Sequence, residues 1–244
     1  MSGTQLSKYS LYLSLVIPVH DEAESLEPLH RELDAALTSI AGGVEIILVD
    51  DGSSDGSLGV MRSLQEKDPR VSIVALERKH GQSAALDAGF RVARGEITAT
   101  LDADLQNDPA DIPRLLAHLD HADVVNGIRV ERRDSALRIL ASRVANSVRN
   151  WVTGDTVTDV GCSLRVMRTD YLREVKLYRG MHRFLPTLLR FEGARIVEVP
   201  VGHRPRRFGR SKYGIGDRLF TGIVDLLAVR WMKSRALRTR KQLR

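Results

Sequence analysis

Cysteine, aromatic residues and long apolar runs are scarce or missing in this sequence, and each absence excludes a class of protein. Cys162 is the single cysteine among 244 residues, so the chain can form neither an internal disulfide framework nor a Cys-based zinc site. No run of about 18 apolar residues is present, so we predict no simple membrane-spanning helix. The first residues (MSGTQLSKYSLYLSLVIPVH) lack a basic region followed by an apolar stretch and a cleavage site, so we predict no signal peptide. These features are typical of a protein of a reducing compartment.

Acidic residues are scarce in the C-terminal part of the chain. Residues 202–244 contain thirteen Lys or Arg and two acidic residues, whereas the rest has 24 basic and 29 acidic residues. Such a tail is typical of proteins that bind a polyanion, such as lipid headgroups, a phosphorylated substrate or nucleic acid; a solvated run of charge is the alternative. Aromatic residues make up 5% of the chain and no base-stacking motif accompanies the charge, so we do not expect a nucleic-acid partner.

Apolar segments alternate with helical patterns over residues 11–130. We predict strands at 11–19, 44–50, 70–78 and 97–104, and helices at 26–40, 57–69, 81–96 and from Asp108 onward. The predicted strands are continuously apolar rather than alternating, which indicates a mostly parallel sheet covered by helices on both faces. We therefore predict an α/β, Rossmann-like fold, with a core that the 43% hydrophobic content can supply.

Polar clusters at 20–24, 50–55 and 102–108 each follow a predicted strand. In a parallel sheet, ligands bind outside the carboxyl ends of the strands, so we expect the three clusters to converge on one crevice. Asp102 and Asp104 can bind a hard cation such as Mg²⁺ or Mn²⁺ through oxygen, with phosphate oxygens completing its coordination shell.

Other interpretations of these clusters fail or remain open. An EF-hand loop counted from Asp102 would need Gly at 107 and Glu at 113, where the chain has Asn107 and Pro113. Asp108, directly before Pro109, is interpreted as a helix N-cap. The segment VDDGSSDGS has neither the G-x-G-x-x-G nor the G-x-x-x-x-G-K-[ST] spacing, so no dinucleotide or P-loop site is predicted there.

Four segments, in this order and spacing, resemble the inverting family 2 glycosyltransferases with a GT-A fold: VIPVHDEAESL, EIILVDDGSSDGS, HGQSAALDAGFRVARGE and LDADLQNDP. The later segments DVGCSLRVMR and VPVGHRPRRFGRSKYG are similar to the polyprenyl-phosphate branch, which includes dolichol-phosphate mannosyltransferase. The resemblance covers roughly residues 11–232. It implies a metal-dependent enzyme that moves a sugar from a nucleotide sugar to a polyprenyl phosphate. Mannose from GDP-mannose is the first expectation and glucose from UDP-glucose the second.

The resemblance also implies roles for the residues at matching positions. Nucleotide-sugar binding is expected of Pro18, Asp21, Glu22, Asp50, Asp51, Gly81, Gln82, Asp102 and Ala103. Metal binding is expected of Asp102, Asp104 and Gln106. Binding of the acceptor phosphate is expected of Arg129, Arg138, Ser142, Arg206, Arg207, Ser211 and Lys212. Catalytic roles are expected of Asp104, Asp159, Arg206 and Arg207.

The chemistry of sugar transfer agrees with these residue types. A departing diphosphate needs stabilisation, which a divalent ion supplies as a Lewis acid. A phosphate acceptor is already anionic near neutral pH, so it needs arginines that position it rather than a strong base. Asp159 can therefore orient an arginine or the sugar, and its role stays open. The arginine-rich HRPRRFGRSK argues against the rival acceptor, a polysaccharide or other soluble glycan.

Two amphipathic segments, 135–152 and 216–235, can be core-packing helices or helices that lie in a membrane interface. We divide the chain into a GT-A domain, 1–215, and an amphipathic juxtamembrane helix with a basic tail, 216–244. Because a polyprenyl phosphate is embedded in a membrane, we expect peripheral binding to the anionic cytoplasmic face, directly or through a separate membrane protein. An inactive scaffold is the remaining alternative.

Overall fold

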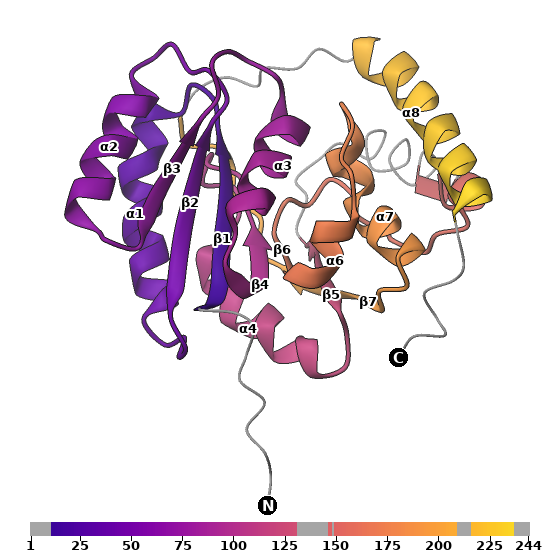
Figure 1. Ribbon diagram of the computed structural model, residues 1–244, viewed down its shortest axis with the longest axis horizontal. Coiled ribbons are helices and arrows are strands. Elements are labelled where there is room, and N and C mark those ends of the chain that lie inside the picture. Colours follow the sequence, from indigo (N-terminus) through magenta and orange to yellow (C-terminus); the bar gives the residue numbers. More distant parts are fainter. Residues whose placement is uncertain (1–10, 131–145, 148, 209–215, 237–244) are drawn as a thin grey trace, which may run out of the picture.

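A seven-stranded sheet forms the centre of the computed structural model, which describes residues 11–130, 146–147, 149–208 and 216–236 (Figure 1). The strands are β1 (Leu11–Val19), β2 (Val44–Asp50), β3 (Val71–Ala75), β4 (Gly95–Thr100), β5 (Val124–Arg129), β6 (Arg165–Arg168) and β7 (Ile196–Val201). Their order across the sheet is β3-β2-β1-β4-β6-β5-β7. Neighbouring strands are parallel, except that β6 runs antiparallel to both β4 and β5. The predicted mostly parallel α/β sheet is confirmed.

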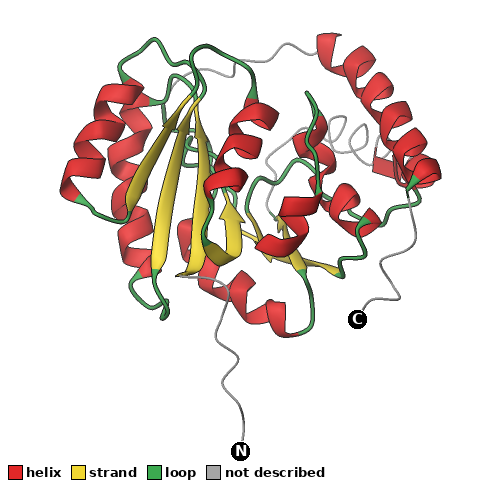
Figure 2. Ribbon diagram, in the orientation of Figure 1, coloured by secondary structure: helices red, strands yellow, loops and turns green. Residues whose placement is uncertain are grey.

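Helices cover both faces of this sheet (Figure 2). They are α1 (Ala23–Leu37), α2 (Ser57–Lys67), α3 (Gln82–Val92), α4 (Ile112–Leu116), α6 (Thr169–Glu174), α7 (Leu185–Phe191) and α8 (Gly216–Arg235), with short 3-10 turns η1 (Pro109–Asp111), η2 (Ala117–Asp120) and η3 (Met181–Phe184). In β1, Leu15 joins the apolar cluster under α1 and α2, and Val16 joins the cluster under α3. Alternate residues of a strand point to opposite faces, so a continuously apolar strand is buried on both.

Several predicted boundaries were wrong. The helix predicted over 26–40 is Ala23–Leu37, and the strand predicted over 70–78 ends at Ala75. The helix predicted to reach Gly95 ends at Val92, because Gly95 already pairs with β1: a Cβ atom there would lie 2.5 Å from the Ser14 amide nitrogen. The strand predicted over 97–104 ends at Thr100, and the chain then turns with a positive φ of 63° at Leu105. Asp102 and Asp104 therefore lie in the loop beyond β4. The predicted N-cap is confirmed, since the Asp108 carboxylate accepts a hydrogen bond from the Ala110 amide at 3.0 Å.

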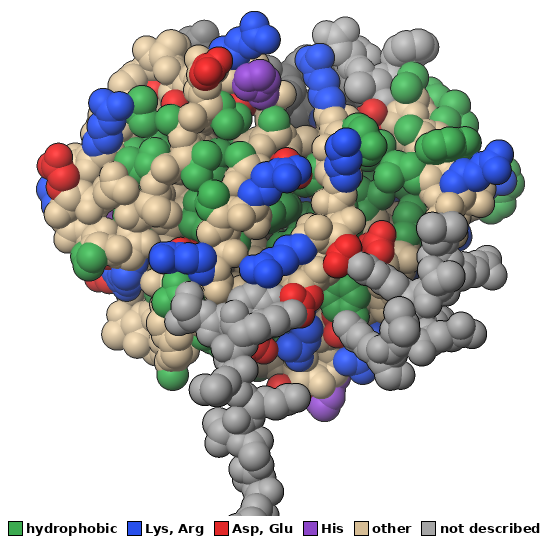
Figure 3. Space-filling view, viewed as in Figure 1, with side chains coloured by type: hydrophobic (Ala, Val, Ile, Leu, Met, Phe, Trp, Pro, Cys, Tyr) green, Lys and Arg blue, Asp and Glu red, His purple; other side chains and the backbone are tan. Residues whose placement is uncertain are grey.

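The helix predicted over 216–235 is confirmed as α8, and it packs against the body on one side only. Val229 is buried with Met181 and Phe184 of η3. The opposite side exposes Ile223, Val224, Leu227 and Trp231, and the neighbouring helical residues 149–153 expose Trp151. Figure 3 shows hydrophobic side chains gathered over the part of the molecule where α8 runs. None of the helices that the structure describes has the length and apolar character needed to cross a membrane.

Candidate active site

The polar clusters at the carboxyl ends of β1, β2 and β4 meet at one cavity of about 890 Å³, so the predicted convergence is confirmed. Ten of the residues singled out from the sequence line it: Pro18, Glu22, Asp51, Gln82, Asp102, Ala103, Asp104, Gln106, Arg129 and Arg206. Five others lie outside its lining: Asp21, Asp50, Gly81, Asp159 and Arg207. The remaining four, Arg138, Ser142, Ser211 and Lys212, are outside the residues that the structure describes.

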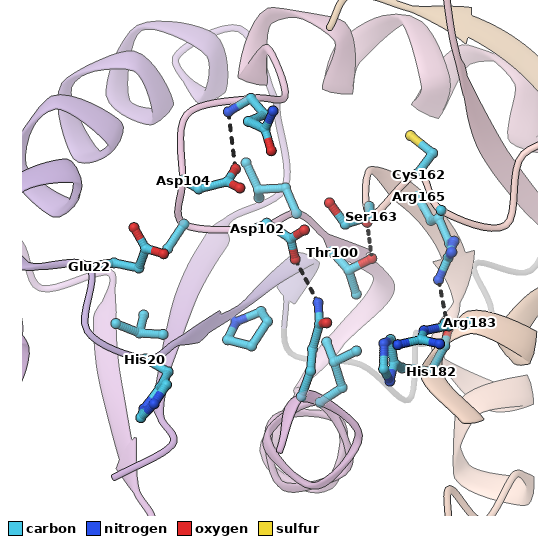
Figure 4. Close-up of a pocket in the computed structure, with 18 of the residues that line it drawn as sticks. His20, Glu22, Thr100, Asp102, Asp104, Cys162, Ser163, Arg165, His182 and Arg183 are labelled. Atoms are coloured by element: carbon cyan, nitrogen blue, oxygen red, sulfur yellow. Dashed lines mark hydrogen bonds between the residues drawn. The ribbon is translucent and has the colours of Figure 1, made fainter. Parts of the chain in front are cut away.

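Asp102 and Asp104 form the centre of the site, between two walls (Figure 4). The Gln82 side-chain amide, at the start of α3, donates a hydrogen bond to Asp102 Oδ1 at 2.7 Å. Asp104 Oδ1 accepts a hydrogen bond from the Gln106 backbone amide at 3.1 Å. Burial, and then the negative charge of Asp104, raise the pKa of Asp102 from 3.8 to about 6. Two carboxylates this close favour a bound cation.

Arg206 connects this centre to the end of β1. Its guanidinium donates to Asp104 Oδ2 at 2.7 Å and to Glu22 Oε1 at 3.0 Å. The segment that carries it is held over the Asp102 loop, because the Arg204 amide donates to the Gln106 carbonyl at 2.8 Å. Arg206 therefore binds one oxygen of a carboxylate that could also hold a metal ion, so the two cations would share Asp104.

The residues present fit a divalent ion that shares its ligands with a substrate. Within the described part of the chain, no three His, Cys, Asp or Glu residues cluster so as to hold a metal by themselves. Asp102, Asp104 and the amide oxygen of Gln106 are the oxygen donors of the loop. Mg²⁺ in particular is commonly bound by one or two carboxylates plus substrate phosphates. The donor set thus suits a metal–diphosphate complex better than an all-protein metal cage.

Three aspartates that the sequence suggested as nucleotide ligands support loops in the structure. The Asp51 carboxylate accepts from the backbone amides of His80 at 2.6 Å and Gly81 at 2.8 Å, which fixes the turn that begins α3. Asp50 accepts from the Ser53 amide at 3.2 Å, and Asp21 from the Ser54 amide at 2.7 Å. Of the three, only Asp51 also lines the cavity.

A paired arginine and aspartate stand behind the other wall. Asp159 accepts two hydrogen bonds from the Arg129 guanidinium, both at 2.8 Å. The loop that carries Asp159 is itself held by Glu198 of β7, which accepts from the Thr158 amide at 2.9 Å and from the Asp159 amide at 3.3 Å. The pair is largely buried, so Asp159 fixes the position of Arg129 at the cavity edge.

Sequence reasoning missed several residues of this wall. Arg165 is buried and donates to Asn126 Oδ1 at 2.8 Å and to the His182 carbonyl at 3.2 Å. His182 Nδ1 lies 2.8 Å from the Ser83 hydroxyl, and burial, helped by the positive charges of Arg183 and Arg165, lowers the pKa of His182 to about 3. His182 is therefore a neutral hydrogen-bonding group. Arg165 lies within the segment DVGCSLRVMR, where the resemblance pointed only to Asp159, and His182 lies outside every motif singled out from the sequence. The packing of η3 against α3 brings His182 to the cavity.

Cys162 also lines this cavity. Burial raises the pKa of its thiol to about 11, so it stays protonated near neutral pH. A nucleophilic role for the single cysteine is therefore not supported.

The raised pKa of Asp102 predicts a pH-dependent stability of the metal-free protein. Because folding favours the neutral carboxyl, this stabilisation is fully present below the ordinary pKa of 3.8 and is lost as the pH rises through about 6. Asp102→Asn removes the charge, so it should raise the free energy of unfolding by about 1–3 kcal/mol at pH 8 and leave it unchanged below pH 4. Urea unfolding in the presence of a chelator measures both values, with Asp108→Asn as the matched control. A gain of equal size at both pH values would contradict the assignment.

A mostly parallel sheet with an Asp-x-Asp loop and a nearby arginine at its ligand-binding edge is the arrangement expected of a glycosyltransferase. The chain belongs to glycosyl transferase family 2, whose family model matches residues 14–176. The resemblance inferred from the sequence motifs is thereby confirmed.

Curated relatives of this chain are transferases that act on polyprenyl phosphates. It is 42% identical over 233 residues to the dodecaprenyl-phosphate galacturonate synthase of Rhizobium johnstonii, covering 93% of this chain and 69% of that protein. It is 42% identical over 206 residues to the undecaprenyl-phosphate 4-deoxy-4-formamido-L-arabinose transferase of Edwardsiella ictaluri, covering 84% of this chain and 63% of that protein. The chain thus spans about two thirds of the length of these relatives.

Solved structures share the fold at low sequence identity. Mannosyl-3-phosphoglycerate synthase from Rubrobacter xylanophilus matches with a TM-score of 0.71 at 18% identity, covering 96% of this chain and 78% of the other. Glucosyl-3-phosphoglycerate synthase from Mycobacterium tuberculosis, in complex with Mn²⁺ and UDP-glucose, matches with a TM-score of 0.67 at 18% identity, covering 94% and 81%. The predicted GT-A architecture is confirmed by these matches.

Proposed function

We propose that this protein transfers a sugar from a nucleotide sugar to a polyprenyl phosphate, with inversion at the anomeric carbon, at the cytoplasmic face of a membrane. The observation that carries the proposal is the junction of Asp102, Asp104 and Arg206 in one cavity. The two carboxylates could bind a metal ion together with a diphosphate, and the arginine beside them could bind a phosphate. The names of the relatives, which specify dodecaprenyl and undecaprenyl phosphate, support the same acceptor class.

Each part of the cavity has a task in this reaction. Asp102, Asp104 and Gln106 would hold Mg²⁺ or Mn²⁺, which stabilises the departing diphosphate when bound. The nucleoside is expected at the end of β1 and β2, near Glu22 and Asp51. The acceptor phosphate carries its own negative charge, so Arg129 and Arg206 need only position it for displacement, while Arg207 lies outside the cavity. No residue of the cavity has to act as a strong base.

The residues of the cavity do not identify which sugar is transferred. Mannose and glucose are the donors expected from the sequence, whereas the relatives are named for galacturonate and 4-deoxy-4-formamido-L-arabinose. The decisive experiment is transfer of radiolabel from nucleotide sugars carrying each of these four groups into liposomes that contain undecaprenyl phosphate, with Mn²⁺ or Mg²⁺.

Lipid-extractable label from one donor would establish the reaction and the sugar together. Label that enters a soluble glycan instead would move the protein to the rival acceptor class. Salt-sensitive duplex binding without transfer would indicate a nucleic-acid-binding protein. A reaction seen only after adding a membrane protein would identify the separate partner.

α8 is the element that we propose to contact the membrane. Its outward side exposes Leu227 by 58% and Trp231 by 63%, and the adjacent Trp151 is 82% exposed. Basic side chains border this apolar surface: Arg230 and Lys233 are exposed and donate to the carbonyls of Val152 and Thr153. An apolar face with tryptophan beside Lys and Arg is the composition of a helix that lies in an anionic bilayer interface.

Exchange of both Leu227 and Trp231 for serine should therefore reduce binding to anionic liposomes about tenfold or more. Sedimentation with vesicles rich in phosphatidylglycerol measures the binding. Substitution of the exposed Val92, which lies on α3, with serine is the control that should leave binding unchanged. Full liposome binding by the double variant would show that α8 is not the contact surface.

A further inference from the structure

Among the residues that the structure describes, one half-buried basic side chain of the cavity has no partner. Its lining includes five basic residues: Lys79, Arg129, Arg165, Arg183 and Arg206. Arg129 is paired with Asp159, and Arg165 donates to Asn126 and to backbone carbonyls. Arg206 is paired with Asp104 and Glu22. Lys79 is exposed to solvent, whereas the half-buried Arg183 has no hydrogen bond or salt bridge to any residue that the structure describes. Its five N–H donors face the cavity and are therefore available to an anionic ligand.

The position of Arg183 restricts which anion it can meet. Figure 4 shows Glu22 on one side of Asp102 and Asp104, and His182 with Arg183 on the other. On our proposed function, the nucleoside lies on the Glu22 side and the diphosphate at the two aspartates. Displacement with inversion then requires the attacking phosphate to approach from the side remote from the diphosphate. That side is the wall formed by η3.

η3 is also the element on which α8 rests. Met181 and Phe184 of η3 pack against Val229 of α8, while His182 and Arg183, between them, line the cavity. The same four-residue turn therefore touches the proposed membrane helix with one side and the substrate with the other. A lipid phosphate that enters beside α8 meets Arg183.

A buried carboxylate of α8 stands at this contact. Asp225 is only 9% exposed, and its Oδ2 atom is buried without a hydrogen bond to any described residue. The Asp225 carboxylate lies against Gly180, the residue directly before η3, since a Cβ atom added there would lie 2.4 Å from Asp225 Oδ2. Burial raises the pKa of Asp225, and the positive charge of Arg183 acts in the opposite direction. Arg183 is thus the charged group that favours the ionised form of this carboxylate.

We propose that Arg183 binds the phosphate of the lipid acceptor and that Asp225 of α8 is the residue that positions it. The proposal rests on the proposed function and adds a phosphate contact on the η3 wall. Guanidinium binds phosphate through two parallel hydrogen bonds, so the orientation of Arg183 matters as well as its charge. Asp225 sets that orientation through the attraction between its negative charge and the positive charge of Arg183.

The test compares Arg183→Gln with the matched control Arg179→Gln, which alters an exposed arginine two residues before η3 that does not line the cavity. With undecaprenyl phosphate in detergent micelles, Arg183→Gln should raise the acceptor KM about 10- to 100-fold and change the donor KM less than about twofold. Arg183→Lys, which keeps a point charge, should restore part of the loss, and Arg179→Gln should behave as the wild type. An unchanged acceptor KM, or an effect on the donor KM instead, would overturn the assignment.

Asp225 is tested through a double-mutant cycle. Asp225→Asn should raise the acceptor KM about three- to tenfold at unchanged kcat, and it should add nothing in the Arg183→Gln background. Additive effects would show that Asp225 does not act through Arg183. Circular dichroism and thermal unfolding verify that each variant folds.

A binding measurement separates this proposal from the proposed function. Calorimetric titration with citronellyl phosphate, a short soluble lipid phosphate, needs no sugar transfer. If the wild type transfers no sugar to lipid, the proposed function fails on its own account. Weaker citronellyl phosphate binding by Arg183→Gln than by Arg179→Gln would then still support the phosphate site. Equal binding by the two variants would refute it.

Discussion

Asp104→Asn should lower the rate of sugar transfer about 10³-fold while the protein remains folded. Asp104 supplies one of two carboxylates at the centre of the cavity and also holds Arg206 at 2.7 Å. Asparagine keeps the shape but removes the charge that would hold the metal ion. Arg206 keeps Glu22 as a partner, so its segment should stay in place. Initial rates at saturating Mn²⁺, together with Mn²⁺ affinity from calorimetry, measure the effect.

Asp108→Asn is the matched control for this substitution. Asp108 lies in the same loop but caps η1 and pairs with Arg204, outside the cavity lining. Asparagine is as good an N-cap as aspartate, so transfer should remain within about twofold of the wild type. Retention of more than a tenth of the activity by Asp104→Asn would exclude Asp104 from the metal site.

The ligand-binding edge could be predicted from the sequence because parallel strands end together. Continuous apolar runs place β1, β2 and β4 in one buried sheet, so the polar residues that follow them must meet at one edge. The roles of individual aspartates are harder to predict. Asp50 and Asp51 are adjacent, yet Asp50 accepts a hydrogen bond from Ser53 in the turn that follows β2. Asp51 instead accepts one from Gly81, at the start of α3, and lines the cavity. Local turn geometry decides this difference, and composition does not encode it.

The register of the arginine-rich segment also required the structure. Arg206 and Arg207 are equivalent in the motif, but Arg206 enters the cavity and Arg207 is exposed outside its lining. Neighbouring residues of an extended segment point in opposite directions, so only one of the two arginines can enter the cavity. The contact that fixes the segment in place determines which one. That contact is the pairing of Asn107 with His203, which joins positions far apart in the chain.

On the wall opposite Glu22, the sequence indicated Arg129 and Asp159 but missed Arg165, His182 and Arg183. β6 is four residues long and runs antiparallel within an otherwise parallel sheet. A strand this short has no hydrophobic pattern from which it could be predicted. Arg165 and Arg183 reach the cavity only because β6 and η3 pack together around it. Such residues depend on long-range packing, which local sequence patterns cannot specify.

Asp159→Asn should lower transfer about 100-fold and reduce the free energy of unfolding by about 2–4 kcal/mol. Asp159 and Arg129 form a largely buried pair with two hydrogen bonds of 2.8 Å. Removing one charge leaves the other buried without its counter-charge, which is strongly destabilising. The loss of activity follows because Arg129 would no longer be fixed at the cavity edge. Urea unfolding and kcat/KM measured on the same preparation give both numbers.

The Arg129→Gln background distinguishes the two roles that remain open for Asp159. If Asp159 acts by orienting Arg129, Asp159→Asn should change neither transfer nor stability much further once Arg129 is gone. If Asp159 were instead a general base, its removal would multiply the defect and abolish the acidic limb of the pH–rate profile. The first outcome is expected, because the attacking phosphate already carries the charge that a base would create, and because both Asp159 oxygens point at the arginine.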